Sequence, residues 1–122
     1  MGKFSLHKSS LLSKKKNIQE LFNKGSSFTL YPLRVYYLAV PDEEKTQVLF
    51  TVAKKNFKKA VDRNRIKRLM REAYRLNRYE FEIPQKLHIA YIYIGNEILP
   101  FQIIEAKLKA TLKKLMKDAA SV

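Results

Sequence analysis

Hydrophobic residues recur every three or four positions in the middle of the chain, starting just after Arg63. This spacing is that of one face of an α-helix. No glycine or proline interrupts residues 63–78. The pattern therefore predicts a long helix with one face buried in the core. The stripe consists of Ile66, Leu69, Met70, Ala73 and Tyr74, with Asn77 as its polar last member.

The same spacing predicts two further helices. One runs from Lys14 to about Lys24, with Ser13 as its expected N-cap and Gly25 ending it at the C′ position. The other follows Pro100, a residue suited to a first helical turn. The apolar positions are Ile18, Leu21 and Phe22 in the first of these helices, and Phe101, Ile104, Leu108, Leu112 and Leu115 in the second.

Alternating apolar and polar positions predict strands over residues 28–40, 47–53 and 87–94. Residues 87–94 are apolar on both faces, so we expect this strand to be central. Residues 1–12 show no period and are interpreted as an extended arm, in which Phe4 and Leu6 are candidate anchors and Lys3, His7 and Lys8 candidate RNA contacts. The order of elements predicts one α+β domain over 1–122, with one sheet packed against three helices.

The distribution of charge indicates what kind of partner the chain binds. The chain has a formal net charge of +14, and residues 54–78 hold eleven basic and two acidic residues, a net charge of +9. On the predicted helix, the side opposite the apolar stripe carries Lys67, Arg68, Arg71, Arg75 and Arg78. Cations four residues apart repel one another, and only Arg68 and Glu72 offset this at that spacing. Solvated faces usually mix signs, so this face favours a polyanionic partner, nucleic acid above all.

Several kinds of chemistry find no support in the residues. The chain has no cysteine, no glycine-rich phosphate loop and no carboxylate cluster for acid–base or two-metal catalysis. Its two histidines, His7 and His88, lack the spacing of metal ligands. No apolar run is long enough to cross a membrane, and we expect a cytoplasmic location with no membrane partner. Single-stranded bases can stack on aromatic rings, for which the candidates are Phe22, Tyr31, Tyr36 and Phe50.

Residues 52–75, VAKKNFKKAVDRNRIKRLMREAYR, resemble the signature of the bacterial ribonuclease P protein subunit. The likeness rests on the triplet Arg63-Asn64-Arg65, on Ile66-Lys67-Arg68, on Arg71-Glu72-Ala73 and on Lys54-Lys55 after a strand. Upstream, Phe22 three residues before Gly25 and Tyr36 in a strand also match. The chain departs from the family at Ile18, where an aromatic residue is frequent, and at Asn56–Lys59, where a glycine is frequent.

The resemblance implies a left-handed β-α-β crossover around the central basic helix. It also implies a ribonucleoprotein enzyme that cleaves precursor tRNA to generate the mature 5′ end, with the active site and its Mg²⁺ held by the partner RNA. The protein would be a subunit without catalytic residues of its own. Carried over to this sequence, the contacts to the catalytic RNA are Arg63, Asn64, Arg65, Lys67, Arg68 and Arg71. The contacts to the single-stranded 5′ leader are Phe22, Tyr36, Lys54 and Lys55.

Three other functions stay open on the residues alone. A ribosomal or assembly protein that binds rRNA without catalysis would have a similar composition. A DNA-binding protein would place the central helix in a major groove, but such helices usually mix Asn, Gln and Ser with Arg. A membrane-surface protein would need its apolar stripe free.

Overall fold

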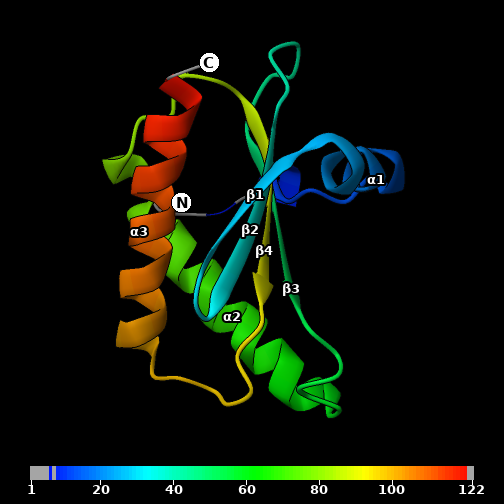
Figure 1. Ribbon diagram of the computed structural model, residues 1–122, viewed down its shortest axis with the longest axis vertical. Helices are drawn as coiled ribbons and strands as arrows, with labels where there is room; N and C mark the ends of the chain where they lie inside the picture. Colours follow the sequence, from blue (N-terminus) through cyan, green and yellow to red (C-terminus); the bar gives the residue numbers. More distant parts are fainter. Residues whose placement is uncertain (1–5, 7, 121–122) are drawn as a thin grey trace.

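The computed structural model describes residue 6 and residues 8–120, excluding the side chain of Ala120. Within them, one four-stranded sheet lies between helices, with α2 and α3 on one face and α1 on the other (Figure 1). The α+β class with three helices is confirmed. The elements in chain order are η1 (Lys8–Ser10), α1 (Lys15–Lys24), β1 (Ser26–Leu30), β2 (Leu33–Ala39), β3 (Gln47–Val52), α2 (Ala60–Asn77), η2 (Arg78–Glu80), β4 (Leu87–Tyr93) and α3 (Phe101–Ala120).

The sheet has the strand order β1-β2-β4-β3. β4 pairs with β2 in antiparallel and with β3 in parallel orientation, so it is central, as its apolar faces predict. The parallel strands β3 and β4 are consecutive in sequence and are joined through α2, which forms the β-α-β unit that the resemblance implies. The connection leaves α2 beside the sheet with one face on the core and the other facing outward (Figure 1).

The prediction of one strand over residues 28–40 is wrong. Two antiparallel strands, β1 and β2, occupy this stretch, and Tyr31-Pro32 connects them through a cis peptide bond. Leu30 and Leu33 are paired across this two-residue turn. Apolar residues continue through the turn without a polar break, and for this reason the alternation alone did not reveal the reversal.

Both predicted caps of α1 need correction. The N-cap residue is Lys14, not Ser13, and no side chain caps the helix there. Gly25 ends the helix, but with φ −74° and ψ 159°, an extended conformation open to any residue. A Cβ atom at Gly25 would lie 2.4 Å from the carbonyl oxygen of Leu21 and 2.8 Å from that of Tyr37. Glycine is needed here because α1 and β2 approach closely, and not because of its conformational freedom.

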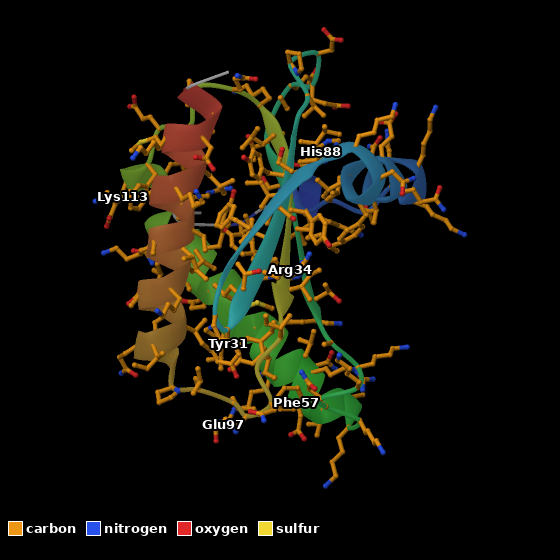
Figure 2. All side chains as sticks on the ribbon, in the orientation of Figure 1. Tyr31, Arg34, Phe57, His88, Glu97 and Lys113 are labelled. Atoms are coloured by element: carbon orange, nitrogen blue, oxygen red, sulfur yellow. The ribbon has the colours of Figure 1, made fainter. Side chains whose placement is uncertain are left out.

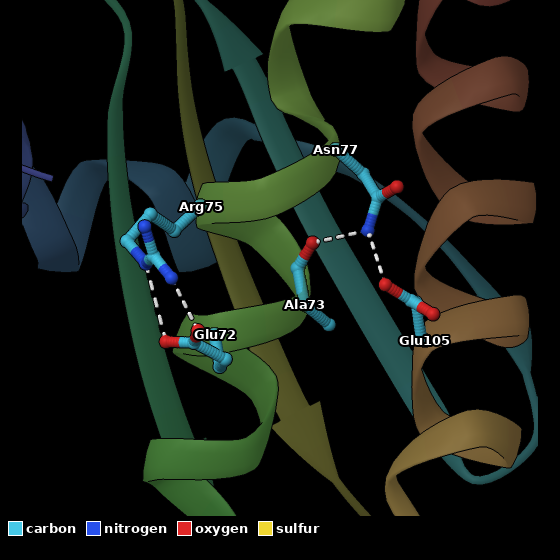
Figure 3. A network of polar contacts seen from close by, with 5 residues as sticks. All are labelled: Glu72, Ala73, Arg75, Asn77 and Glu105. Atoms are coloured by element: carbon cyan, nitrogen blue, oxygen red, sulfur yellow. Dashed lines mark hydrogen bonds and ion pairs between the residues drawn. The ribbon is translucent and has the colours of Figure 1, made fainter. Parts of the chain in front are cut away.

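The helix α2 begins at Ala60, three residues earlier than predicted, and its stripe packs as expected. Ile66, Met70 and Ala73 are fully buried against the sheet and α3. The polar residue of the stripe, Asn77, is also buried, and its side-chain amide donates to the carbonyl oxygen of Ala73 at 2.7 Å and to Glu105 Oε2 of α3 at 3.0 Å (Figure 3). These bonds satisfy the buried amide and tie the end of α2 to α3.

The N-terminal segment packs along the edge of the sheet. Lys8–Ser10 form a short 3-10 helix, Leu11 forms a parallel bridge with Val48 of β3, and the Leu12 amide donates to the Val48 carbonyl at 2.8 Å. This segment therefore runs beside β3 and in the same direction. Of the predicted arm, Lys3, Phe4 and His7 lie outside the described residues.

Candidate nucleic-acid interface

The outward face of α2 carries most of the predicted contacts to the catalytic RNA. Asn64, Arg65, Arg68 and Arg71 are exposed, and Lys67 is half-buried at the flank of this face. An α-helix places these residues on three successive turns. The helix therefore presents a rigid row of guanidinium groups, whose planar forks suit phosphate oxygens.

The one acid on the outer side of α2 is engaged within the helix. Glu72 is paired with Arg75, whose Nε and Nη2 both donate to the carboxylate (Figure 3). Hydrogen bonding from Arg75 lowers the pKa of the Glu72 carboxyl group, so the pair stays charged at neutral pH. Glu72 therefore offsets the charge of Arg75 and not, as expected, that of Arg68. Within the described part of the chain Arg68 forms no ion pair, so its charge can meet an external partner.

Arg63 has a different environment from the other residues of the triplet. It is half-buried, and its Nη1 donates to the carbonyl oxygens of Phe57 at 2.8 Å and Lys58 at 2.9 Å. These two hydrogen bonds hold the loop between β3 and α2 against the start of the helix. Its predicted contact with RNA stays a prediction, and its contact with the loop was missed because sequence spacing does not report backbone acceptors.

Arg78 does not extend the outward row of cations as predicted. It follows α2 and is half-buried, and its guanidinium lies over the rings of Tyr79, at 4.7 Å, and Tyr74, at 6.0 Å. Arg78 thus belongs to a separate aromatic cluster at the C-terminal end of α2.

A second candidate surface is the part of the sheet that lies beside α1. The rings of Phe22 in α1 and Tyr36 in β2 meet edge to face, with centroids 4.7 Å apart. Phe22 is 37% exposed, and the Arg34 guanidinium lies 5.4 Å from the Tyr36 centroid. The structure therefore brings two of the predicted leader contacts together and adds a cation that the prediction did not include. The alternation in β2, which places Arg34 on the same face as Tyr36, is the signal that could have identified it.

This surface continues across the sheet. Arg34 is paired in register with Ile92 of β4, and Ile92 with Thr51 of β3. In the adjacent row, Ala90 is buried beneath α1 together with Leu12 and Leu21. α1 thus covers one row, while Arg34 stays exposed and Ile92 and Thr51 are half-buried. The result is a partly open sheet face next to the aromatic pair, with Arg34 on it (Arg34 is labelled in Figure 2).

Lys54 and Lys55 follow β3 after one residue, Ala53, and both are exposed. The path of the next residues, Asn56–Lys59, is defined by the Asn56 side-chain amide, which donates to the carbonyl oxygens of Ile94 at 3.0 Å and Gly95 at 3.3 Å. This amide ties the loop to the end of β4. The two lysines are therefore presented at the C-terminal end of a sheet edge by an anchored turn.

The other two candidate stacking residues, Phe50 and Tyr31, differ in their exposure to solvent. Phe50 is only 8% exposed and packs parallel to the ring of Tyr91 at 5.8 Å, so it belongs to the core and its predicted stacking role is wrong. Tyr31 is 55% exposed and lies in the turn between β1 and β2 (Figure 2).

Neither a metal-binding cluster nor a membrane-spanning helix is found among the described residues. Among residue 6 and residues 8–120, no group of three or more His, Cys, Asp or Glu side chains is placed to hold a metal ion. Over the same part of the chain, no helix has the length and apolar character needed to cross a membrane.

Comparison with known proteins adds a family to this geometry. The family model described as Ribonuclease P matches residues 6–119. The protein described as "Ribonuclease P protein component" from Porphyromonas gingivalis is 37% identical over 126 aligned positions, which cover 98% of this chain and 90% of that protein. A protein of the same description from Chlorobium phaeobacteroides is 40% identical, covering 75% of this chain and 73% of the other.

Solved structures share the fold. The RNase P protein of Staphylococcus aureus superposes with a TM-score of 0.75 at 24% identity, covering 88% of this chain and 95% of that chain. The RNase P protein of Thermotoga maritima gives a TM-score of 0.72 at 25% identity, with 85% and 96% covered. The arrangement of one mixed sheet with three helices is therefore shared with these proteins.

Proposed function

This chain belongs to the ribonuclease P protein family, and from this premise we propose that it binds two RNAs on two surfaces. The outward face of α2 contacts the catalytic RNA of ribonuclease P, and the sheet face beside α1 contacts the 5′ leader of precursor tRNA. As a protein component of ribonuclease P, the chain acts in the removal of that leader. The family membership gives no support to a ribosomal or assembly protein.

The contact with the catalytic RNA is supported by the row of cations on α2. Arg65, Arg68 and Arg71 are exposed, and the acid of this face, Glu72, is paired with Arg75. A polyanion on this face relieves the repulsion between the cations and releases counterions from the RNA. Asn64 and Lys67 lie beside them and add a hydrogen-bonding amide and one more cation.

The contact with the leader is supported by the pair formed by Phe22 and Tyr36. Single-stranded RNA is commonly bound by aromatic rings that stack on bases and by cations that track the backbone. Arg34 lies over the Tyr36 ring, and Lys54 and Lys55 are exposed at the end of β3. Both requirements are therefore present on one side of the sheet and at its end.

In this proposal the protein supplies binding, and the partner RNA supplies the active site. Cleavage requires Mg²⁺, which the RNA holds for the most part. The residues of the chain bind and orient the two RNAs and take no part in bond cleavage. The enzyme works in the cytoplasm, where precursor tRNA is made.

The single observation that carries this proposal is the exposed cationic row on α2 of a chain in this family. Its test is the variant Arg68→Ala, because Arg68 is exposed and is not among the buried residues of α2. The affinity for the catalytic RNA is measured at several salt concentrations. The slope of log K against log salt should fall by about 0.7–0.9 for the lost phosphate contact. Unchanged affinity and slope in a folded variant would contradict this assignment.

The division of labour has its own test. Purified protein is incubated with precursor tRNA and Mg²⁺, with and without the catalytic RNA. We expect cleavage at the mature 5′ end only when the catalytic RNA is present. Specific cleavage by the protein alone would show that the chain itself holds catalytic groups.

A further inference from the structure

Two hollows lie beside the N-terminal segment that packs along β3. The narrower hollow, about 230 Å³, is lined by residues that include Leu11, Lys67 and Arg71. The wider hollow, about 470 Å³, is lined by residues that include Ser10 and Arg78. None of the described residues lines both hollows, but Ser10 directly precedes Leu11 in the chain. The wider hollow therefore follows the narrower one along the N-terminal segment.

α2 and the residue that follows it contribute cations to both hollows. Lys67 and Arg71 of α2 line the narrower hollow, and Arg78, which follows α2, lines the wider one. Lys67 and Arg71 are two of the proposed contacts to the catalytic RNA. The wider hollow therefore lies at the C-terminal end of the helix that carries the proposed RNA-binding face.

The wider hollow is itself suited to an anion. Lys45, Arg78 and Lys86 line it, and none of the described residues that line it is Asp or Glu. Glu80, which follows in η2, pairs instead with Lys109 of α3 at 3.7 Å. Cations from three separate segments of the chain therefore converge on one hollow, whereas a solvated helix face would gather them on a single element.

The same hollow has the aromatic surface that a nucleobase needs. Tyr79 is 53% exposed, the Arg78 guanidinium lies 4.7 Å from its ring centroid, and Arg78 Nη2 donates to the Tyr79 hydroxyl at 2.8 Å. Tyr74 and Phe81 add apolar walls. Unstacked bases in RNA bind on tyrosine rings and on the planes of arginine side chains.

We propose that this hollow, the Tyr79 pocket, holds an unpaired nucleotide of the catalytic RNA. The base stacks on Tyr79 and Arg78, and the phosphates contact Lys45 and Lys86. The proposal rests on the proposed function, because it assigns this hollow to the RNA that binds α2. The catalytic RNA is favoured over the leader, because Phe22 and Tyr36 lie with α1 on the opposite face of the sheet.

Two substitutions test the pocket by affinity. Tyr79→Ala removes the stacking surface and should weaken binding of the catalytic RNA about tenfold, within the range measured for base–aromatic stacking. Lys86→Ala removes an exposed cation and should lower the salt slope by about 0.7–0.9 without unfolding the domain. The matched control is Lys113→Ala, which removes an exposed lysine from the outer side of α3 and should leave both quantities unchanged (Figure 2).

Proximity is tested by directed cleavage. Because the chain has no cysteine, Glu82→Cys provides a unique attachment point for an iron chelate beside the pocket, with Tyr79 intact. Hydroxyl radicals generated there in the assembled complex should cut the catalytic RNA at a discrete site, and the same chelate on Lys113→Cys should not cut that site. Cuts confined to bound precursor tRNA would assign the pocket to the other RNA and overturn the proposal.

The outcomes separate this inference from the proposed function. If Arg68→Ala weakens binding and reduces the salt slope while Tyr79→Ala and Lys86→Ala do neither, the Tyr79 pocket is wrong and the proposed function stands. If Arg68→Ala has no effect either, the contact on the outward face of α2 fails, and the inference fails with it. Circular dichroism of each variant identifies any loss that comes from unfolding.

Discussion

The guanidinium of Arg63 donates a hydrogen bond to the carbonyl oxygen of Phe57 at 2.8 Å. The same nitrogen reaches the carbonyl oxygen of Lys58 at 2.9 Å, so one side chain of α2 holds the loop that precedes the helix. The N-cap residue of α2, Lys59, makes no side-chain cap hydrogen bond. Arg63 therefore stabilises this helix start from within the helix, and one member of the basic triplet has a structural role whatever RNA binds.

Arg63→Ala should lower the stability of the free protein. Hydrogen bonds to charged groups contribute about 1.5–3 kcal/mol, and because Arg63 is only half-buried we expect a loss of about 1–2 kcal/mol. Urea unfolding followed by circular dichroism measures this loss. Arg68→Ala is the matched control, and as an exposed residue it should change the free energy of unfolding by less than about 0.5 kcal/mol. Equal stability of the two variants would mean that the loop does not depend on Arg63.

Phe22→Ala should weaken binding of precursor tRNA to the assembled enzyme more than binding of mature tRNA. Only the precursor has a leader, and stacking contributes about 1–3 kcal/mol per base. Tyr36→Ala should behave in the same way, because the two rings pack together at 4.7 Å. The measurement is the ratio of the two dissociation constants.

Tyr31→Ala serves as the control for this pair. It removes an exposed ring of similar size from the turn between β1 and β2 and should leave the ratio unchanged. A similar loss of affinity for both tRNAs in Phe22→Ala and Tyr36→Ala would show that these rings contribute to assembly or stability and do not contact the leader.

Periodicity predicted the parts of this fold that depend on burial. The stripe of α2, the stripe of α3 and the central position of β4 follow from which residues must leave water, and all three are confirmed. Reversals and caps were predicted less well. At Tyr31-Pro32 and at Lys14, local backbone geometry decides the outcome, and the apolar pattern carries no information about it.

The candidate site was predicted as residue types and not as a geometry. Exposure of Arg68 and Arg71 follows from their positions opposite the stripe of α2. The environments of Arg63 and Arg78 do not, because their partners are backbone carbonyls and aromatic rings brought close by the fold. The Tyr79 pocket could not be predicted for the same reason. Lys45, Tyr79 and Lys86 come from separate segments, and no helical or strand periodicity relates their positions.

Gly25→Ala should be costly although its backbone conformation is accessible to any residue. The added Cβ would lie 2.4 Å from the carbonyl oxygen of Leu21 and 2.8 Å from that of Tyr37, and main-chain atoms of packed elements cannot easily move apart. We expect a loss of about 1–3 kcal/mol in the free energy of unfolding, as for other overpacked sites. Because α1 would shift against β2, leader binding through Phe22 should weaken as well.

The matched control for Gly25 is Gly95→Ala. Its nearest neighbours would be side-chain atoms, the Tyr93 ring at 3.1 Å and the Pro32 ring at 3.2 Å, which can adjust by small movements. Its loss of stability should therefore be smaller. Thermal unfolding of both variants tests the order, and an equal or larger loss in Gly95→Ala would contradict the explanation by close backbone approach.

His88 should make the stability of the protein depend on pH below neutrality. The residue is 2% exposed in β4 and lies in register with Leu38 and Gln47, and its Nε2 has no hydrogen-bond partner among the described residues. Burial lowers its pKa below the ordinary value of 6.5, against a smaller opposing effect of Glu43 and Glu20. The folded chain therefore takes up this proton at lower pH than the unfolded chain does.

It follows that the free energy of unfolding decreases as pH falls through about 6.5, since the unfolded state binds the extra proton first. Above this pH both states are neutral at His88, and its contribution is constant. Urea unfolding between about pH 7.5 and about pH 5.5 measures the slope for the native chain and for His88→Gln, which cannot titrate in this range. His7 is present in both proteins, so the difference between the slopes isolates His88. The variant should show a flatter dependence whatever its absolute stability, and parallel curves would mean that His88 titrates alike in the folded and unfolded chain.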